Sequence, residues 1–217
     1  MKYVPITARH RQKLTEYNLT HIPEDSVRYV RFEPGETISK EDCPINSIYL
    51  VVRGRAKVCR TASNGGHHIL CYYVSDGIIG EIELLTSQKI AACTTITISD
   101  FECIAINYHA CAGELKTNPV FLFRLGTALA EKVSNNGDNL VSIALHSGEQ
   151  RLCAYILKTS HRDIFSDVLT DVACSVGISY RHMFRILGHL CDEKILEKRP
   201  NGYLILNHRL LTERSGQ

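Results

Sequence analysis

The chain has little net charge and no long apolar run. Among its 217 residues, 25 Lys and Arg stand against 23 Asp and Glu, so the formal net charge of +2 does not by itself indicate a nucleic-acid partner. No apolar stretch approaches the roughly 20 residues that cross a bilayer, and no secretory signal pattern opens the sequence. We therefore expect a cytoplasmic protein with no membrane partner.

Cysteine pairs with metal or redox spacing are absent as well. The sequence has nine cysteines, an odd number, and no C-x-x-C motif, which favours reduced thiols. The first 42 residues contain no cysteine, so they lack the ligands of an iron–sulfur cluster. Thiol redox sensing stays open as an alternative. Its candidates are Cys43 and Cys111, because both lie at predicted loop or helix edges.

The motifs of common enzyme classes are missing too. The chain has no H-E-x-x-H sequence, no phosphate-binding loop and no Ser/His/Asp order. His67 and His68 are adjacent, so in a strand their side chains point to opposite faces, whereas a cupin-type metal site takes two histidines from one face. We expect no catalytic residues and no metal site. A cupin-like metal enzyme is kept as the alternative from another class.

The most informative pattern that is present predicts a helix-turn-helix over residues 169–188. Ala173 is small where two helices must cross, and Gly177 suits a turn that needs a positive φ. Ser179 is a good N-cap for a second helix. That helix carries an apolar stripe formed by Met183, Ile186, Leu187 and Leu190.

The sequence around this motif predicts a winged version of it. A helix over 150–158 precedes the motif, and strands over 195–198 and 203–206 follow it, joined by a turn over 199–202. From Arg151 onward, 10 Lys and Arg against 7 Asp and Glu give a net charge of +3, whereas the first 150 residues carry 15 against 16. This asymmetry is weak support for an anion-binding C-terminal part.

Upstream, residues 26–110 are typical of a β sandwich or jelly roll, with short Val-, Ile- and Thr-rich runs separated by Gly- and Asn-containing turns. The clearest predicted strands cover 48–52 and 91–98. We expect four parts: an N-terminal segment 1–25, a β-barrel sensor domain 26–117, a dimerisation helix 118–147 and a winged helix-turn-helix domain 148–217.

The helix predicted from residue 118 has about 27 residues and an almost heptad apolar seam. A seam of this kind usually packs on a second copy of the chain; the alternative is packing on the chain's own barrel. Residues 134–139 are poor helix formers, so either Asn136 fixes the register or this segment has an order that can be switched. The seam consists of Leu122, Leu125, Leu129, Val133, Asn136, Leu140 and Ile143.

A β domain, a long helix and a winged helix-turn-helix, in this order, resemble the CRP/FNR superfamily of bacterial transcription regulators. The resemblance covers about residues 27–210 and is carried by Phe32–Ile38, Ile48–Val58 and Ile79–Leu84, while residues 177–183 are more similar to its YeiL-type branch. It implies an α+β fold with a cyclic-nucleotide-binding-like β jelly roll, a dimerisation helix and a winged helix-turn-helix. It also implies a homodimer on an inverted-repeat operator in double-stranded DNA, and contact with RNA polymerase.

The resemblance does not extend to the phosphate site of the family's cAMP binders. There an Arg-Ser/Thr-Ala segment holds the cyclic phosphate, whereas the corresponding segment here is Ala91-Ala92-Cys93, with Lys89 two residues early. Burying a phosphate without a paired cation is expensive. We therefore expect no cAMP and no other cofactor, but an unknown effector. Its candidate pocket is formed by Gly80, Glu81, Ile82, Ala91, Ala92 and Asn136.

The second helix of the motif supplies the candidate DNA contacts. On a helical wheel Arg181 and Arg185 lie opposite the apolar stripe, so we predict that they read bases, with Tyr180 and His182 as base or phosphate contacts. Arg181 stands where CRP has a glutamate, so the CRP half-site is not expected. Phosphate contacts are predicted for Ser179, Lys194, Lys198 and Arg199. The predicted function is a sequence-specific regulator that senses a small-molecule or redox signal; a constitutive regulator is the alternative.

Overall fold

The computed structural model describes residues 1–61, 68–86 and 90–216. The chain divides into two compact units, Met1–Val133 and Ser134–Gln217, each of which is described by itself. No helix in the described part of the chain is long and apolar enough to cross a membrane. Both units have their own apolar core, in agreement with the predicted α+β class.

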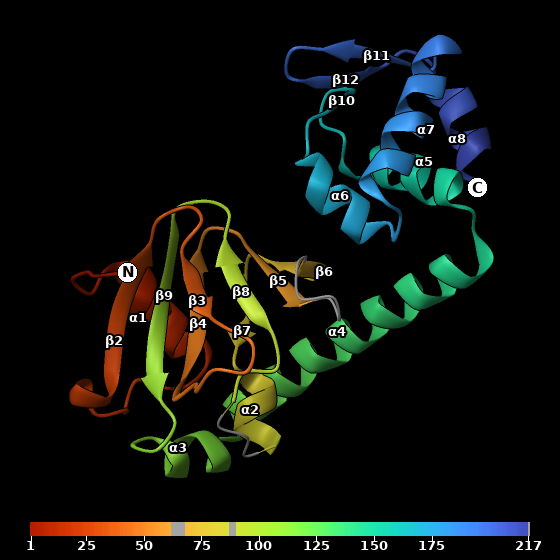
Figure 1. Ribbon diagram of the computed structural model, residues 1–217. Coiled ribbons are helices and arrows are strands. Elements are labelled where there is room, and N and C mark those ends of the chain that lie inside the picture. Colours follow the sequence, from red (N-terminus) through yellow and green to blue (C-terminus); the bar gives the residue numbers. More distant parts are fainter. Residues whose placement is uncertain (62–67, 87–89, 217) are drawn as a thin grey trace. The chain divides into compact units, whose positions relative to one another are not determined.

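The first unit is built on two antiparallel sheets (Figure 1). A five-stranded sheet has the order β1-β2-β9-β4-β7, and a four-stranded sheet has the order β3-β8-β5-β6. The predicted β jelly roll is therefore confirmed. The strands are β1 Lys2–Tyr3, β2 Val27–Phe32, β3 Thr37–Ser39, β4 Ser47–Arg53, β5 Ala56–Thr61, β6 His68–Val74, β7 Ile78–Ile79, β8 Thr94–Thr97 and β9 Phe101–Asn107.

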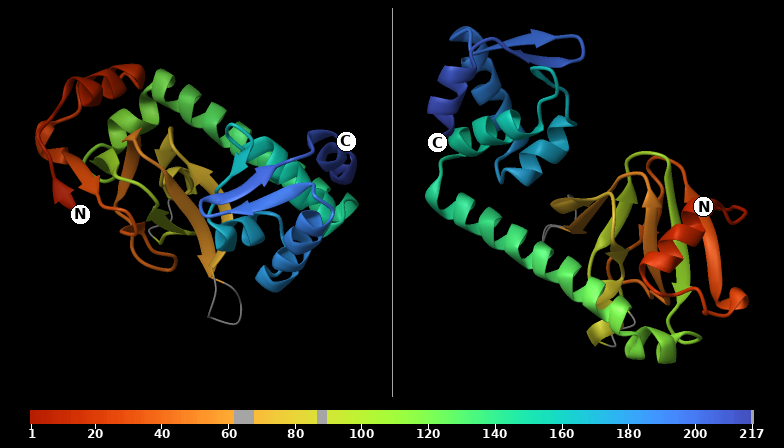
Figure 2. Two further views of the ribbon diagram at one scale, coloured as in Figure 1. Left: turned by 90° about the horizontal axis from the view of Figure 1, so that it is seen from above. Right: turned by 180° about the vertical axis from the view of Figure 1, so that it is seen from behind.

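Residues 1–25, which were predicted to form a separate N-terminal segment, contribute two elements to this unit. Strand β1 pairs with β2, with Lys2 opposite Arg31, and the helix α1, Ala8–Glu16, packs near β4 (Figure 2). Thr7 caps α1 by accepting a hydrogen bond from the His10 amide. A short 3-10 helix, η1 (Glu24–Ser26), then leads into β2.

The five-stranded sheet is buried on both faces. Successive side chains of a strand point to opposite faces, and apolar side chains lie on both faces of this sheet. One face packs in a core with the second sheet and includes Val51, Phe101 and Cys103. The other face, which includes Ile48 and Ile104, packs on helices α1, α3 (Ala112–Thr117) and α4 (Pro119–Leu145). Such burial on two sides explains why β4 and β9 are the most continuously apolar strands.

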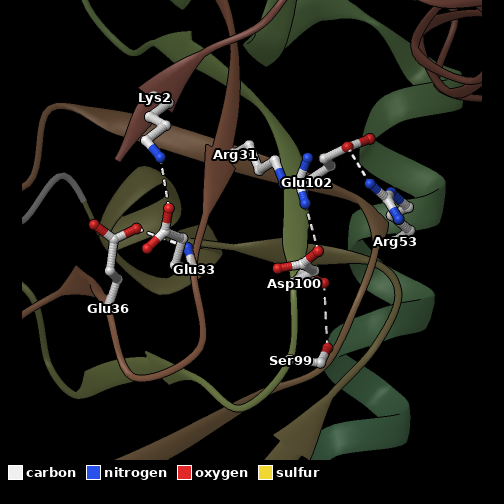
Figure 3. Close-up of polar contacts among 8 residues, drawn as sticks. All are labelled: Lys2, Arg31, Glu33, Glu36, Arg53, Ser99, Asp100 and Glu102. Atoms are coloured by element: carbon white, nitrogen blue, oxygen red, sulfur yellow. Dashed lines mark hydrogen bonds and ion pairs between the residues drawn. The ribbon is translucent and has the colours of Figure 1, made fainter.

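Charged side chains cover the exposed end of the same sheet (Figure 3). Arg31 of β2 pairs with Asp100, which directly precedes β9. Arg53 of β4 pairs with Glu102 of β9, and Lys2 of β1 lies 2.6 Å from the Glu33 carboxylate. The Arg31–Asp100 and Lys2–Glu33 pairs are largely exposed and contribute little free energy, whereas the Glu102 side chain is only 14% exposed.

The strand predicted over 91–98 is wrong at its start, because β8 begins at Thr94. The backbone of Ala91 bonds instead to the loop at residues 42–43, and the amide of Ala92 donates to the Glu83 carboxylate at 2.8 Å. The expectation of an all-β region is also incomplete, since α2, Glu81–Thr86, lies inside it.

Helix α4 has the predicted length of 27 residues. The two halves of its predicted seam differ in burial: the first half packs on the barrel, and the second half is exposed. Leu125 is buried in the barrel core, with Leu122 and Leu129 packed against that core. Leu140 and Ile143 are exposed. The alternative of packing on the chain's own barrel therefore holds for the first half of the seam. The reason is that Phe121 and Leu125 lie one turn apart on the face that meets β4 and β9.

The second unit is the predicted winged helix-turn-helix (Figure 1). Two elements were not predicted: β10, which adds a third strand in the order β10-β12-β11, and the final helix α8. The guanidinium of Arg151 ties the motif to α5 by donating to the Val176 carbonyl at 2.7 Å. The elements are α5 Gly148–Thr159, β10 Ile164–Phe165, α6 Leu169–Ser175, α7 Tyr180–Asp192, β11 Leu196–Arg199, β12 Gly202–Ile205 and α8 His208–Ser215.

Candidate nucleic-acid interface and barrel pocket

Helix α7 begins at a defined cap and presents one apolar face to the core. The Ser179 hydroxyl accepts a hydrogen bond from the His182 amide at 3.1 Å, which satisfies one of the free donors of the first turn. Gly177 in the preceding turn has a φ of +65°, as its sequence position predicts. Met183, Ile186, Leu187 and Leu190 are all buried.

The opposite face of α7 is exposed and basic. Arg181 and Arg185 are both exposed, one turn apart, and Gly188 continues their stripe with open space around it. Beside the arginines lie two aromatic rings, Tyr180 and Phe184, which are 48% and 38% exposed. The sequence analysis did not name Phe184. Its position outside the buried stripe was a signal that this apolar side chain would be exposed.

The other predicted contacts lie at the edges of this face. His182 is half-buried, and its ring lies close to Gly148 at the start of α5. Lys194 and Lys198 are exposed, Lys194 in a left-handed conformation just after α7. Arg199 is exposed but pairs with Glu197 at 2.6 Å within the same strand. Arg199 therefore holds a carboxylate that a phosphate would have to displace.

In the first unit, a small pocket opens at the junction of β7 and α2. Glu81 lines it with only 4% of its side chain exposed, and the ammonium of Lys132 in α4 lies 2.5 Å from the Glu81 Oε1. The Lys132 ammonium also donates to the Ile78 carbonyl at 3.2 Å. The pocket is lined by Ser39, Ile45, Val58, Ile79, Gly80, Glu81, Ile82, Glu83, Ala92, Cys93 and Thr95.

Gly80 lines the pocket at a point where other atoms come close to its backbone. Its φ is +92°, and a Cβ there would lie 2.6 Å from the Tyr108 hydroxyl, which donates to the Gly80 carbonyl at 2.6 Å. Burial, with Glu83 and Glu81 nearby, raises the pKa of Tyr108 far above its usual value, so this hydroxyl stays a donor. The bond therefore holds β7 and the start of α2 in place.

Comparison with known proteins agrees with this architecture. The model of the cyclic nucleotide-binding domain family matches residues 29–118. The chain is 28% identical to the regulatory protein YeiL of Escherichia coli O157:H7 over 197 residues, which is 89% of this chain and 88% of that protein. These matches support a transcription regulator of the CRP/FNR type, as the sequence motifs indicate.

Solved structures show the same fold at low identity. The c-di-GMP responsive global regulator CLP of Xanthomonas campestris has a TM-score of 0.78 at 15% identity, over 91% of this chain and 99% of that one. A transcriptional regulator of the CRP/FNR family from Eubacterium rectale has a TM-score of 0.75 at 15% identity, over 98% and 96%.

Within this CRP/FNR-type barrel, the predicted pocket residues divide into two groups. Gly80, Glu81, Ile82 and Ala92 line the pocket, while Ala91 is buried outside its lining. Asn136 lies in the second unit with its side chain exposed.

Two residues named in the sequence analysis lie outside the described residues: Lys89, near the predicted phosphate segment, and His67, one of the two histidines weighed for a cupin-type metal site. Lys132 was missed by sequence reasoning, because only packing of α4 on the barrel brings it to Glu81.

The two redox candidates differ in their surroundings. Cys43 is half-buried, but Cys111 is fully buried just before α3, and this burial raises the pKa of its thiol. The predicted helix edge is there, yet packing under η1 and α3 removes the exposure on which the reactivity of Cys111 depended. Among the described residues, no group of three or more His, Cys, Asp or Glu is placed to hold a metal ion.

Proposed function

We propose that this protein is a sequence-specific DNA-binding regulator that works as a homodimer in the cytoplasm and senses a small molecule other than cAMP or a redox signal. The observation that carries the DNA-reading part is the exposed pair Arg181 and Arg185 on a helix whose other face is buried. Arginine with guanine O6 and N7 is the commonest specific contact in the major groove. Contact with RNA polymerase at the bound site is part of the same proposal.

The test separates base reading from phosphate binding. Operators are first selected from random duplexes, and binding is then measured on the selected and a scrambled duplex. Arg181→Ala should lose about 1–3 kcal/mol of binding on the selected duplex only. Lys198→Ala should weaken both duplexes alike. An equal loss on both duplexes for Arg181→Ala would contradict base reading.

The homodimer is proposed to form along an exposed heptad stripe of α4 that differs from the predicted seam. Its members alternate at spacings of three and four residues, so they share one face of the helix, and all are exposed. Two of them are glycines with open space around them, where a second helix could approach closely. The stripe consists of Phe123, Gly126, Ala130, Val133, Gly137, Leu140 and Ala144.

Sedimentation tests this stripe with a matched pair of variants. Val133→Glu places a charge in the stripe and should give a monomer with weak operator binding. Asn135→Glu adds the same charge two residues away, on the opposite side of the helix, and should remain dimeric. A dimeric Val133→Glu variant would place the interface elsewhere.

The barrel is proposed to bind something other than cAMP, because the acidic side chain of Glu81 lines its pocket and Ala91 stands at the position of the arginine that holds the phosphate in the family's cAMP binders. Native mass spectrometry of the protein purified from its own cells tests for a bound small molecule. Isothermal titration with cAMP should show no binding at micromolar concentration, and a stoichiometric signal would refute this part.

A further inference from the structure

The aromatic pair on α7 has no role in the core of the second unit. The rings of Tyr180 and Phe184 meet edge to face, with centroids 4.7 Å apart. Neither belongs to the cluster of buried side chains that α7 forms with α5, α6 and the strands β11 and β12. The two rings instead form a small apolar patch on the exposed face of α7, beside Arg181 and Arg185.

Major-groove DNA offers one apolar group that fits such a ring. Thymine alone carries a C5-methyl group at the groove edge, and phenylalanine is among the side chains that contact it. Phe184 precedes Arg185 by one residue and is turned by about 100° around the helix axis from it. A methyl group read by Phe184 would therefore lie beside the guanine that Arg185 reads.

We propose that Phe184, held by Tyr180, reads the methyl group of a thymine in each half-site. This rests on the proposed DNA-reading function of α7. Four residues along a helix span about 6 Å, and base pairs are about 3.4 Å apart, so the thymine lies within about two base pairs of a guanine read by Arg181 or Arg185. Gly188 has no side chain, so the DNA could come close to α7 one turn after Arg185.

Fluorescence anisotropy with modified duplexes tests the methyl group itself. Each thymine of the selected operator is replaced in turn by deoxyuridine, which removes only the methyl. The full-length protein should bind about fourfold more weakly at one position per half-site, the factor expected when one buried methyl is lost. At that position, 5-methylcytosine should be bound better than cytosine.

Three variants assign the effect to a side chain. Phe184→Ala should bind the thymine and deoxyuridine duplexes equally while keeping its preference for the guanines. Tyr180→Ala, which removes the support of the ring, should reduce the discrimination in part. Lys198→Ala should weaken both duplexes and leave their ratio unchanged.

The outcomes separate this proposal from the one beneath it. If operators are selected but no thymine methyl matters, or if Phe184→Ala keeps the fourfold ratio, methyl reading by Phe184 is wrong and base reading by the arginines stands. If no sequence is preferred over random DNA, the proposed function itself fails and the methyl reading fails with it.

Discussion

Replacing Lys132 by methionine tests whether the barrel depends on the contact between its pocket and α4. The variant keeps the length and apolar stem of the side chain and removes its charge. In the wild-type protein the ammonium of Lys132 lies 2.5 Å from the Glu81 carboxylate, whose side chain is 4% exposed. In the variant this carboxylate would have lost its cation. Taking away one partner of such a pair leaves an uncompensated charge out of water.

The expected loss follows from this burial. Removing one member of a buried ion pair costs about 3–5 kcal/mol, and because the Lys132 side chain is itself 20% exposed we expect the lower end, about 3 kcal/mol. Glu81→Gln should cost only about 1 kcal/mol, since the lysine can extend its ammonium into water. The free energy of unfolding of the double variant should be about 2 kcal/mol higher than that of Lys132→Met alone.

Hydrogen exchange read by mass spectrometry measures this in the full chain. The slowest amides of β4 and β9 report the opening of the barrel. A loss of about 3 kcal/mol should speed their exchange about 100-fold, while the amides of α7, in the other unit, serve as the internal control. Arg31→Met, at a largely exposed ion pair, is the matched control and should change exchange little.

Two results would refute the reasoning. If the two single variants lose equal stability, the expectation that removing the lysine costs more than removing the buried carboxylate is wrong. If their effects add in the double variant, the two charges are not coupled.

Three further predictions follow from other sites. Burial lowers the pKa of His10 below its usual 6.5, so the folded state binds fewer protons and stability should fall as pH drops below about 6.5; a His10→Gln variant should show a smaller slope in urea midpoints between pH 5 and 7.5. Gly54→Ala would place a Cβ 2.3 Å from the Asp100 carbonyl oxygen and should cost about 3 kcal/mol or more, whereas Gly35→Ala, with open space, should cost about 1–2, both by urea unfolding. Iodoacetamide should modify Cys43 before Cys111 in the native protein, and equal rates by peptide mapping would contradict the buried thiol.

Much of the winged helix-turn-helix unit could be predicted from the sequence, because its signals are local. Ser179 as a cap, Gly177 at a positive φ and the stripe of Met183 each depend on residues within one or two helical turns. The same helical period placed Arg181 and Arg185 on the exposed face. The barrel followed from its strand pattern and turns, and the family from motifs spread over both units.

The sequence by itself therefore determined the kind of protein and the face that α7 exposes. Only the tertiary structure decided which side of α4 the barrel covers: the first half of the predicted seam packs on the barrel, and the exposed stripe shares only Val133 and Leu140 with that seam. It also brought Lys132 to Glu81, 51 residues apart in sequence, and buried Cys111. Helical period fixes the relation between neighbouring residues, whereas a contact between distant ones depends on how whole elements pack, which no local pattern contains.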